Sequence, residues 1–288
     1  MIKRLKAKFR LYWPLIKSLQ TGLLVFTGLA GYMSAQCPVL HLDRLAGLLV
    51  SLVASISGST VLNMLWDRDI DARMRRTQQR PLASGKIRPA EALWVGLALS
   101  ILGVGLAMAM DWVYGLIILA GWFFDVLVYT VWLKRRTCWS IVWGGISGGM
   151  PVLAGRALGL GGVDWIGLLL AAGVLFWIPT HILTFSLRYF DDYQAAGVPT
   201  FPSTYGPRLT RLTIAAASIL AALAMGIAAW GISISWGVVR LLVVLSAGLL
   251  LLAFSETVRP SERSSVGLFK YASVYMLAAM ILVIVGVI

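Results

Sequence analysis

Residues 45–71 read LAGLLVSLVASISGSTVLNMLWDRDID, an apolar run that ends in one amide and three carboxylates. Within it, Asn63, Asp67 and Asp71 stand four residues apart. Residues at this spacing turn by only about 40° from one to the next around a helix, so their side-chain oxygens lie along one stripe. Carboxylate and amide oxygens are suitable ligands for hard cations such as Mg²⁺. The stretch therefore predicts a helix that ends in a site for Mg²⁺ and a diphosphate.

The composition is that of an integral membrane protein. Of the 288 residues, 59% are apolar, 13% are charged and 12 are tryptophan. Runs of about 20 mainly apolar residues, enough to cross about 30 Å of hydrocarbon as a helix, recur along nearly the whole length. We therefore expect an all-α, multi-pass fold of about nine transmembrane helices in the lipid bilayer, forming a single domain over residues 1–288. The expected helices span 14–35, 45–66, 91–110, 112–133, 139–158, 163–187, 209–232, 236–257 and 266–288.

The basic residues alternate from side to side on this map, and all but three of the 25 Lys and Arg fall on one side. The exceptions are Arg44, Arg156 and Arg240. By the positive-inside rule the crowded side is cytoplasmic, which places the N-terminus inside and the C-terminus outside the cell membrane. Cys37 and Cys138 then lie on opposite sides and cannot pair. The net charge is +13, but the basic residues lie in loops between membrane helices and do not form one face of a soluble domain. We therefore expect no nucleic-acid partner.

Two polar loops, 67–89 and 188–207, are long enough to carry chemistry, and both lie on the predicted cytoplasmic side. Non-helical backbone near the hydrocarbon must be buried in protein or line a wet cavity, so we expect the site to open toward the cytoplasm. Each loop starts with carboxylates that would chelate metal if the loops face one another. Alternatively, these carboxylates are helix caps or partners of the arginines, and Asp69 can pair with Arg73 at i+4. The carboxylates are Asp67, Asp69 and Asp71 in the first loop and Asp191 and Asp192 in the second.

Three segments resemble, in order, the signature segments of the UbiA superfamily of intramembrane prenyltransferases. They are NMLWDRDIDARMRRTQQRPLASGKI (63–87), YTVWLKRRT (129–137) and SLRYFDDYQAAGVPTFPSTYG (186–206). Within the superfamily the nearest resemblance is to the protoheme IX farnesyltransferases, or heme O synthases. The resemblance runs from about residue 14 to the end of the chain.

The resemblance implies nine transmembrane helices around a central cavity, with Mg²⁺ and an allylic diphosphate bound under the cytoplasmic loops. It implies transfer of a farnesyl-like group to a hydrophobic acceptor, with protoheme IX giving heme O as the first choice. A quinone precursor, a chlorophyll-type macrocycle and a glycerol lipid are the alternative acceptors, and a membrane transporter is the alternative from another class. By motif position, the metal ligands are Asn63, Asp67, Asp71, Asp191 and Asp192, of which Asp67, Asp71 and Asp191 are also the expected catalytic carboxylates.

Three departures from the family pattern bear on the acceptor and the second metal. The superfamily often has a carboxylate four residues before its second acidic pair, where this chain has Leu187 and Arg188. The heme-related enzymes tend to carry His-Phe-Trp where this chain has HIL at 181–183, and Met-Leu-Pro where it has TFP at 200–202. These differences weaken the expectation of a heme acceptor without touching that of prenyl transfer.

An allylic diphosphate ionises to a delocalised carbocation once the charge of its leaving group is neutralised. We expect Arg80, Lys134 and Arg135 to contact its phosphate oxygens, since arginine binds them in a bidentate manner and lysine as a point charge. These residues also fit a simpler role as cytoplasmic charges. Aromatic side chains can line the chamber that holds the cation, although such residues often face lipid instead. The candidates are Trp66, Trp122, Phe123, Tyr129, Trp143 and Trp177.

Two ionisable residues lie inside predicted helices. Asp125 falls in the fourth helix, where an ionised carboxylate facing lipid would cost at least about 2.5 kcal/mol, so it should face the cavity or stay protonated. It can act as a catalytic base, orient the acceptor, or only hydrogen-bond a neighbouring helix. His181 falls in the sixth helix and, with a heme acceptor, can ligate iron or take a proton, or it is a hydrogen-bonded packing residue. Prenyl length and oligomeric state are not encoded in any pattern of this kind.

Overall fold

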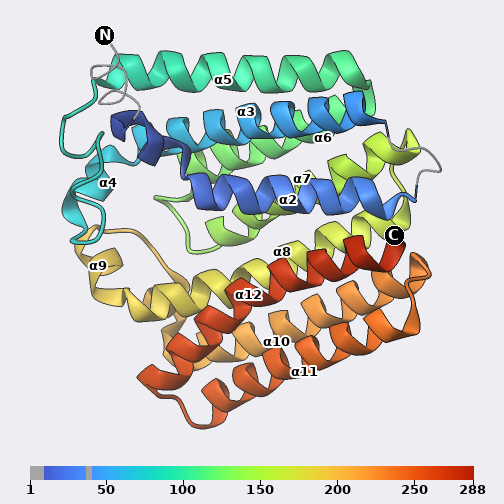
Figure 1. Cartoon of the computed structure of the whole chain (residues 1–288). Helices are drawn as coiled ribbons and strands as arrows, with labels where there is room; N and C mark the ends of the chain where they lie inside the picture. The colour runs from blue at the N-terminus through green and yellow to red at the C-terminus, as the bar shows by residue number, and fades with distance from the viewer. Residues whose placement is uncertain (1–9, 37–40) are drawn as a thin grey trace.

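The computed structural model describes residues 10–36 and 41–288, and all the regular elements within these ranges are helical (Figure 1). Most are α-helices, while η1 is a 3₁₀-helix and η2 a π-helix. In chain order the elements are η1 (Trp13–Ile16), α2 (Ser18–Ser34), α3 (Leu42–Trp66), α4 (Arg68–Arg73), α5 (Pro89–Met110), α6 (Trp112–Trp122), η2 (Phe123–Leu133), α7 (Ser140–Leu160), α8 (Trp165–Arg188), α9 (Phe190–Ala195), α10 (Phe201–Gly231), α11 (Trp236–Val258) and α12 (Glu262–Val287).

Seven helical stretches are long and apolar enough to cross a membrane: α3, α5, α6 with η2, α8, α10, α11 and α12. They confirm the expected all-α, multi-pass membrane protein. The predicted runs over 14–35 and 139–158 coincide with α2 and α7, which are not among the seven. α2 has only 17 residues, and α7 is rich in glycine and carries Arg156. A total of nine spans and a cytoplasmic N-terminus stay predictions.

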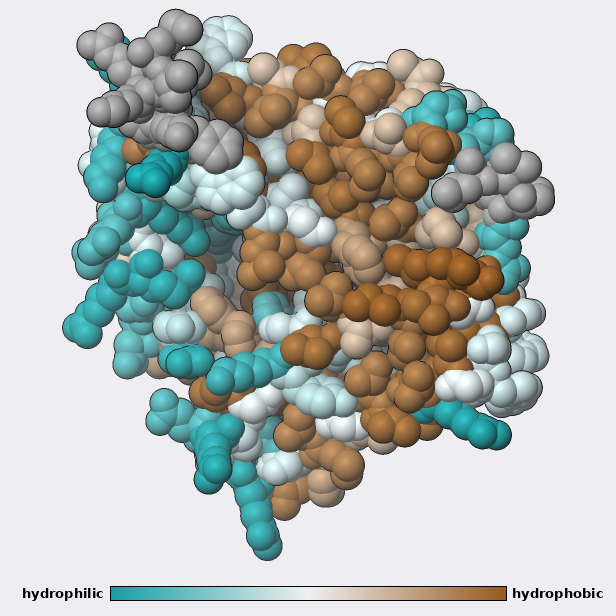
Figure 2. All heavy atoms as spheres, viewed as in Figure 1, coloured by the Kyte–Doolittle hydropathy of each residue, from teal (hydrophilic) through white to brown (hydrophobic). Residues whose placement is uncertain are grey.

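The outer surface of the bundle is apolar along its flank. Val244, Leu251 and Phe254 of α11 are 67%, 69% and 66% exposed, values that suit contact with lipid rather than water. Figure 2 shows hydrophobic residues covering much of this view, whereas hydrophilic residues gather at the end that holds α4 and α9. The two polar loops therefore lie at one polar end of the bundle.

Glycines let α2, α7 and α8 approach closely. A Cβ on Gly155 of α7 would overlap the carbonyl oxygen of Gly28 in α2, and one on Gly149 would lie 2.7 Å from the Ala171 carbonyl oxygen in α8. Small residues at such crossings allow backbone contact between helices in a membrane. Gly149 belongs to the glycine-rich stretch of residues 143–150, WGGISGGM, in which small residues let α7 approach α8.

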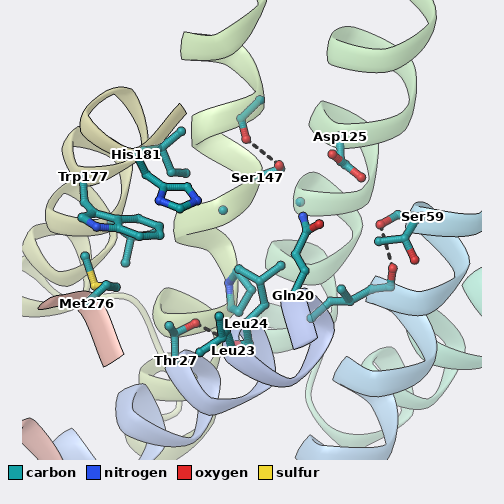
Figure 3. A pocket seen from close by; sticks show the side chains of 18 of the residues that line it. Gln20, Leu23, Leu24, Thr27, Ser59, Asp125, Ser147, Trp177, His181 and Met276 are labelled. Atoms are coloured by element: carbon teal, nitrogen blue, oxygen red, sulfur yellow. Dashed lines mark hydrogen bonds between the residues drawn. The ribbon is translucent and has the colours of Figure 1, made fainter. Parts of the chain in front are cut away.

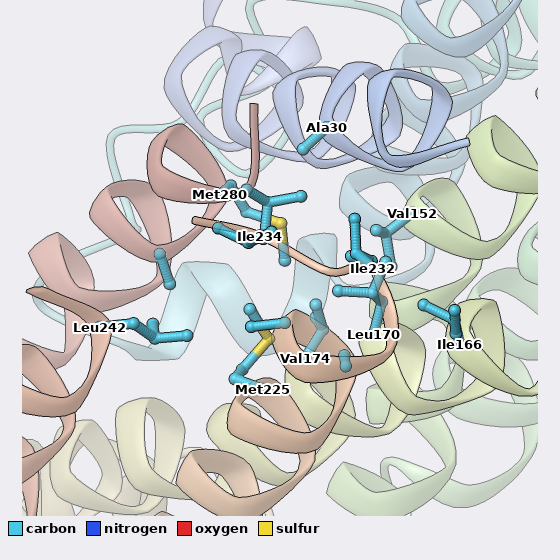
Figure 4. Packing of buried hydrophobic residues seen from close by; sticks show 14 of the residues in the cluster. Ala30, Val152, Ile166, Leu170, Val174, Met225, Ile232, Ile234, Leu242 and Met280 are labelled. Atoms are coloured by element: carbon cyan, nitrogen blue, oxygen red, sulfur yellow. The ribbon is translucent and has the colours of Figure 1, made fainter. Parts of the chain in front are cut away.

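Behind this crossing, buried apolar side chains from α7, α8, α10 and α12 form a continuous core (Figure 4). Val152, Leu170, Met225 and Met280 have essentially no exposed surface. The core fixes α8 against α7 and α12, and these helices carry one wall of the cavity described below.

Two further features refine the sequence map. α10 starts at Phe201, before the predicted residue 209, but its backbone is interrupted at Gly206, whose φ of 79° and ψ of 166° are not helical. Glycine adopts this conformation without the steric cost that a Cβ would add. Cys138 is buried and has no disulfide, whereas Cys37 lies outside the described residues.

Candidate active site

The stripe of Asn63, Asp67 and Asp71 forms across the junction of α3 and α4. α3 ends at Trp66, yet the Asp67 N–H donates to the Asn63 carbonyl at 2.9 Å and the Asp71 N–H to the Asp67 carbonyl at 2.8 Å. Because this i to i+4 pattern continues through the junction, the three side chains stay on one face. They are buried, with exposures of 7%, 3% and 5%. Buried carboxylates need partners, and the structure supplies basic ones.

Lys134 and Arg80 bind the two buried carboxylates. Lys134 Nζ, immediately after η2, donates to Asp67 Oδ2. Arg80 Nη1, in the loop between α4 and α5, donates to Asp71 Oδ1 at 2.9 Å and to Oδ2 at 2.8 Å. Two of the basic residues expected to contact a diphosphate therefore lie beside the expected metal ligands, where they stabilise the ionised carboxylates.

Asp69 faces away from the stripe and pairs with Arg135, so a pair with Arg73 was the wrong expectation. Arg135 donates to Asp69 Oδ1 at 2.6 Å and to Oδ2 at 2.7 Å, and also to the Trp66 carbonyl at 2.6 Å. These hydrogen bonds lower the pKa of Asp69 to about 2. Arg135 reaches the C-terminal end of α3, where it satisfies the Trp66 carbonyl, a group to which Arg73 makes no hydrogen bond. Its contact with a diphosphate stays a prediction.

The oxygens along the stripe suit a small divalent cation. Asp67 Oδ1 is buried, and no hydrogen-bond partner for it exists among the residues that the structure describes. The Asn63 amide donates from Nδ2 to Thr130 Oγ1 at 2.7 Å, which turns its Oδ1 away from Thr130. Mg²⁺ in proteins takes one or two carboxylates and completes its shell with phosphate oxygens and water. An unpaired buried carboxylate oxygen on the same helical face as an amide oxygen fits that requirement.

The second acidic pair lies in α9, close to the first loop but in a different environment. Asp191 is exposed and Asp192 half-buried. α4 and α9 lie at the same end of the bundle (Figure 1), and apolar side chains join the two loops. Within residues 10–36 and 41–288 no three His, Cys, Asp or Glu side chains are grouped to hold a metal. The two loops are in contact. Asp67 and Asp71 form ion pairs with Lys134 and Arg80, however, and do not form a cluster with Asp191 and Asp192. The joining residues are Ile70, Met74, Tyr193, Ala196 and Val198.

Lys17 also lies at the candidate site and was not among the predicted site residues. It immediately precedes α2, and its Nζ lies 3.5 Å from Asn63 Oδ1. Burial lowers its pKa to about 8, with further lowering by the nearby charges of Lys134 and Arg80. Three cations around one small volume repel each other, and a bound anion would relieve that repulsion. In the sequence, its only sign is its position as a single lysine near the start of the first apolar run.

The π-helix η2 brings Asp125 and Lys134 toward the same region. The Lys134 N–H donates to the Tyr129 carbonyl at 2.8 Å and Thr130 Oγ1 to the Asp125 carbonyl at 2.7 Å, both across five residues. In an α-helix, nine residues turn a side chain by about 180°, which would separate the two charges. In the wider π-helix, Asp125 lies near enough to Lys134 and Asp67 to interact with them electrostatically. Such π segments are frequent at functional sites.

A cavity of about 580 Å³ starts one helical turn from the charged site. Thr60 and Tyr129 line it, and the Tyr129 ring centroid lies 5.4 Å from Lys134 Nζ. Its walls come from α2, α3, α6, η2, α7, α8 and α12 and are mostly apolar. Asp125 and His181 lie on opposite sides of it, and Gln20 extends between them (Figure 3). Its volume is typical of a site for a large hydrophobic ligand.

The six aromatic residues proposed for the chamber divide into two groups. Trp122, Tyr129 and Trp177 line the cavity. Trp66, Phe123 and Trp143 do not, and are 45%, 46% and 44% exposed. The helical rotations that decide between lining and lipid contact were not available from the sequence.

The His181 ring is held in one plane. It stacks between Trp177, at a centroid distance of 5.1 Å, and Phe269, at 4.6 Å. Its Nδ1 lies 3.3 Å from Ser273 Oγ, and that hydroxyl donates to the Phe269 carbonyl at 2.9 Å. Both faces of the imidazole are therefore covered, and an edge projects into the cavity (Figure 3). No pattern in the sequence links Phe269 or Ser273 to His181.

Comparison with known proteins yields relatives in sequence and in structure. The UbiA prenyltransferase family matches residues 24–285. Among the similar proteins is the "Protoheme IX farnesyltransferase" of Korarchaeum cryptofilum, 42% identical over 72% of this chain and 69% of its own length. The "Protoheme IX farnesyltransferase" of Bradyrhizobium diazoefficiens is 37% identical over 93% of this chain and 86% of its own length.

Solved structures share the fold at low sequence identity. One, from work on digeranylgeranylglyceryl phosphate synthase in membranes, superposes with a TM-score of 0.82 at 18% identity, covering 98% of this chain and 99% of its own. A UbiA homolog from Archaeoglobus fulgidus bound to GPP and Mg²⁺ gives a TM-score of 0.70 at 16% identity, covering 96% and 98%. The family match extends over nearly the whole chain. The chain therefore belongs to the UbiA prenyltransferase family and is a membrane-embedded prenyltransferase.

Proposed function

We propose that this protein transfers a farnesyl-like group from an allylic diphosphate to protoheme IX, giving heme O, in a reaction that depends on Mg²⁺. The observation that carries the proposal is the unpaired, buried Oδ1 of Asp67, on a carboxylate that Lys134 binds and about two helical turns from Thr60 at the edge of a large apolar cavity. The names of the relatives at 42% and 37% identity support the acceptor. The homolog bound to GPP and Mg²⁺ supports the metal and the donor class.

In this proposal Asn63, Asp67 and Asp71 hold the metal from α3 and α4, and Asp191 and Asp192 approach it from α9. Bound Mg²⁺ would supply charge neutralisation for the diphosphate leaving group. The protein's contribution is a fixed stripe of oxygens, and Asn63 is oriented by its hydrogen bond to Thr130. Apolar contacts between the two loops keep the second pair at the same end of the bundle as the first.

The basic side chains of the site receive the diphosphate. Arg80, Lys134 and Lys17 surround the stripe, and Arg135 stands beside it. With a cation held by Asp67 and Asp71, Lys134 and Arg80 would be released from these carboxylates and available to donate to phosphate oxygens. These donors stabilise the negative charge that develops as the allylic C–O bond breaks.

The cavity below the site holds the prenyl chain and the acceptor away from water. Tyr129, Trp122 and Trp177 present aromatic groups to the space where the allylic cation forms, and aromatic faces attract positive charge. A largely apolar lining also limits hydrolysis of the cation.

We assign Asp125 as the base of the transfer step. The acceptor donates an electron pair to the allylic carbon, a new bond forms, and diphosphate departs with the electrons of the broken C–O bond. The vinyl carbon that this attack leaves electron-deficient takes up one water molecule, and the proton that the water releases passes to the Asp125 carboxylate. Asp125 is the only Asp or Glu among the described residues that line the cavity. We also infer that the site opens toward the cytoplasm of the cell membrane, on the basis of the uneven distribution of Lys and Arg.

The test measures diphosphate release and prenylated product together. Purified protein in nanodiscs is incubated with Mg²⁺, farnesyl diphosphate and one of four acceptors: iron protoporphyrin IX, a hydroxybenzoate, a chlorophyllide or a phosphoglycerol. We expect product from the porphyrin alone and loss of release in Asp67→Ala and Asp71→Ala. Asp43→Ala is the matched control, because Asp43 is an exposed carboxylate at the other end of α3. Release unaffected by Asp67→Ala would refute the metal assignment, and product from another acceptor would refute the heme assignment.

A further inference from the structure

We infer that Nε2 of His181 is the axial ligand to the iron of the bound macrocycle. The inference rests on the proposed heme acceptor and adds a residue role to it. A chain of hydrogen bonds behind the imidazole, through Ser273 to the Phe269 carbonyl, sets which ring nitrogen is free to coordinate iron.

The Ser273 hydroxyl has one proton, and it donates that proton to the Phe269 carbonyl at 2.9 Å. Its oxygen is then positioned to accept from His181 Nδ1, 3.3 Å away, and we assign the proton of the neutral imidazole to Nδ1. Nε2 is left with an unshared electron pair. Metal-bound histidines commonly donate their other N–H to a fixed acceptor in this way, which sets the tautomer and the ring orientation.

Nε2 itself is available to a ligand. Across the described part of the chain it makes no hydrogen bond, while the ring lines the cavity. Trp177 and Phe269 cover the two faces of the imidazole at interplanar angles of 16° and 21°. A partner can therefore reach the ring only in its own plane, which is the direction from which a metal binds an imidazole nitrogen.

The surroundings favour an iron macrocycle over a proton as the partner of Nε2. His181 is the only His among the described lining residues, and Asp125 lies on the opposite side of the cavity rather than beside the imidazole (Figure 3). The walls are mostly apolar and the volume is about 580 Å³, which suits a flat hydrophobic ligand. Met276 also lines the cavity and offers a thioether, a weaker competitor for iron.

The experiment compares iron protoporphyrin IX with metal-free protoporphyrin IX in nanodiscs, using Soret spectra and equilibrium titration. His181→Phe keeps an aromatic ring in the stack but has no ligand atom. We expect this variant to bind the iron porphyrin at least about 10-fold more weakly and to lose the shifted Soret band, with unchanged affinity for the metal-free porphyrin. Ser273→Ala, which frees the tautomer, should weaken iron binding by about 10-fold with the same selectivity.

His41→Ala is the matched control, because the chain has only two histidines and His41 is exposed at the start of α3. It should behave as the wild type, and added imidazole should restore the band in His181→Gly. An unchanged spectrum in His181→Phe, equal loss of both porphyrins, or loss of the band in Met276→Leu alone would overturn the inference. If prenyl transfer to heme persists in those cases, the proposed function stands. A wild-type protein that neither binds nor prenylates iron porphyrin overturns both.

Discussion

The two acidic clusters of this enzyme occupy loops at the same end of the bundle but differ in how firmly they are held. Asp67 and Asp71 are 3% and 5% exposed, and each is bound by a basic side chain. Asp191 and Asp192 are more accessible, and in the described structure their carboxylates make no hydrogen bond or ion pair. The first cluster is therefore organised before any ligand arrives, whereas the second can adjust to one. Preorganised groups carry more of a catalytic effect than groups that must first be ordered.

The largest expected difference between the clusters is in turnover. Asp67→Asn removes a buried oxygen that no neighbouring carboxylate replaces, and we expect kcat for prenyl transfer to fall by about 10²–10³-fold. Asp191→Asn leaves Asp192 in place, so we expect a fall of about 10-fold or less. Single-turnover product formation at saturating Mg²⁺ checks both. Equal losses in the two variants would contradict the contrast between the clusters.

The clusters should also differ in stability. Asp67→Ala leaves Lys134, whose side chain is 17% exposed, without its partner, and we expect the unfolding free energy to fall by about 1–3 kcal/mol. Asp191→Ala leaves no buried group unpaired and should change it by about 0.5 kcal/mol or less. Thermal unfolding in nanodiscs, followed by tryptophan fluorescence, measures both changes. Adding Lys134→Met to Asp67→Ala should recover part of the loss, and no recovery would argue against the pair.

Titration of Lys17 gives the first cluster a pH dependence that the second lacks. The pKa of Lys17 is about 8, below its usual 10.5, so the unfolded chain holds this proton to higher pH than the folded protein. Keeping charged Lys17 buried lowers the unfolding free energy, and this cost is present in full below pH 8. Between pH 8 and 10.5 the cost is relieved, so the unfolding free energy should rise with pH. A diphosphate favours charged Lys17, so its affinity should instead fall above pH 8, by up to about tenfold per pH unit.

Calorimetric titration with a non-hydrolysable prenyl diphosphate analogue between pH 7 and 10 tests this dependence. Lys17→Met should flatten the affinity profile above pH 8. Lys86→Met, at an exposed lysine of the first loop, should keep the wild-type profile. A profile that is the same in Lys17→Met and the wild type would remove Lys17 from the site.

The smallest effect is expected outside both clusters, at the Asp69–Arg135 pair. The side chains are 48% and 37% exposed, so solvent screening limits the contribution of the pair to about 1 kcal/mol at most. The pKa of Asp69 is lowered to about 2 from 3.8, so this stability is present above pH 3.8 and is lost as pH falls toward 2. Chemical unfolding of Asp69→Asn at pH 7 and at pH 3 measures it. If Asp69→Asn lowered the unfolding free energy more at pH 3 than at pH 7, the result would contradict a stabilising pair that requires ionised Asp69.

The charged site was largely readable from the sequence, because its parts follow from local rules. The spacing of Asn63, Asp67 and Asp71 predicts one helical face, and the structure has that face with an oxygen available for a cation. The apolar runs predict the membrane helices, seven of which meet the length and hydropathy requirement. Each of these inferences needs only the neighbours of a residue along one element.

The cavity could not be predicted in the same way, since its lining depends on how several helices rotate against each other. The sequence offers no means to choose Trp122 over Phe123 as a wall residue, although the two are adjacent. It does not connect His181 to Ser273, 92 residues away. Lys17 was overlooked for a related reason, because its contact with Asn63 spans 46 residues. Asp69 was assigned the wrong partner because Arg135 comes from another element.

The π-helix η2 makes the charged pair of Lys134 and Asp67 depend on the number of residues in a segment as well as on their identity. A π turn spans one residue more than an α turn, so removing a single residue between Val126 and Val128 would let the segment relax to ordinary α geometry. Eight α-helical residues would then separate Asp125 from Lys134 and leave their side chains about 80° apart around the helix axis. Every chemical group of the active site would survive such a deletion, yet its ammonium and carboxylate would no longer meet. For this protein we therefore expect the loss of one codon inside a membrane span to impair prenyl transfer about as much as the replacement of Asp67.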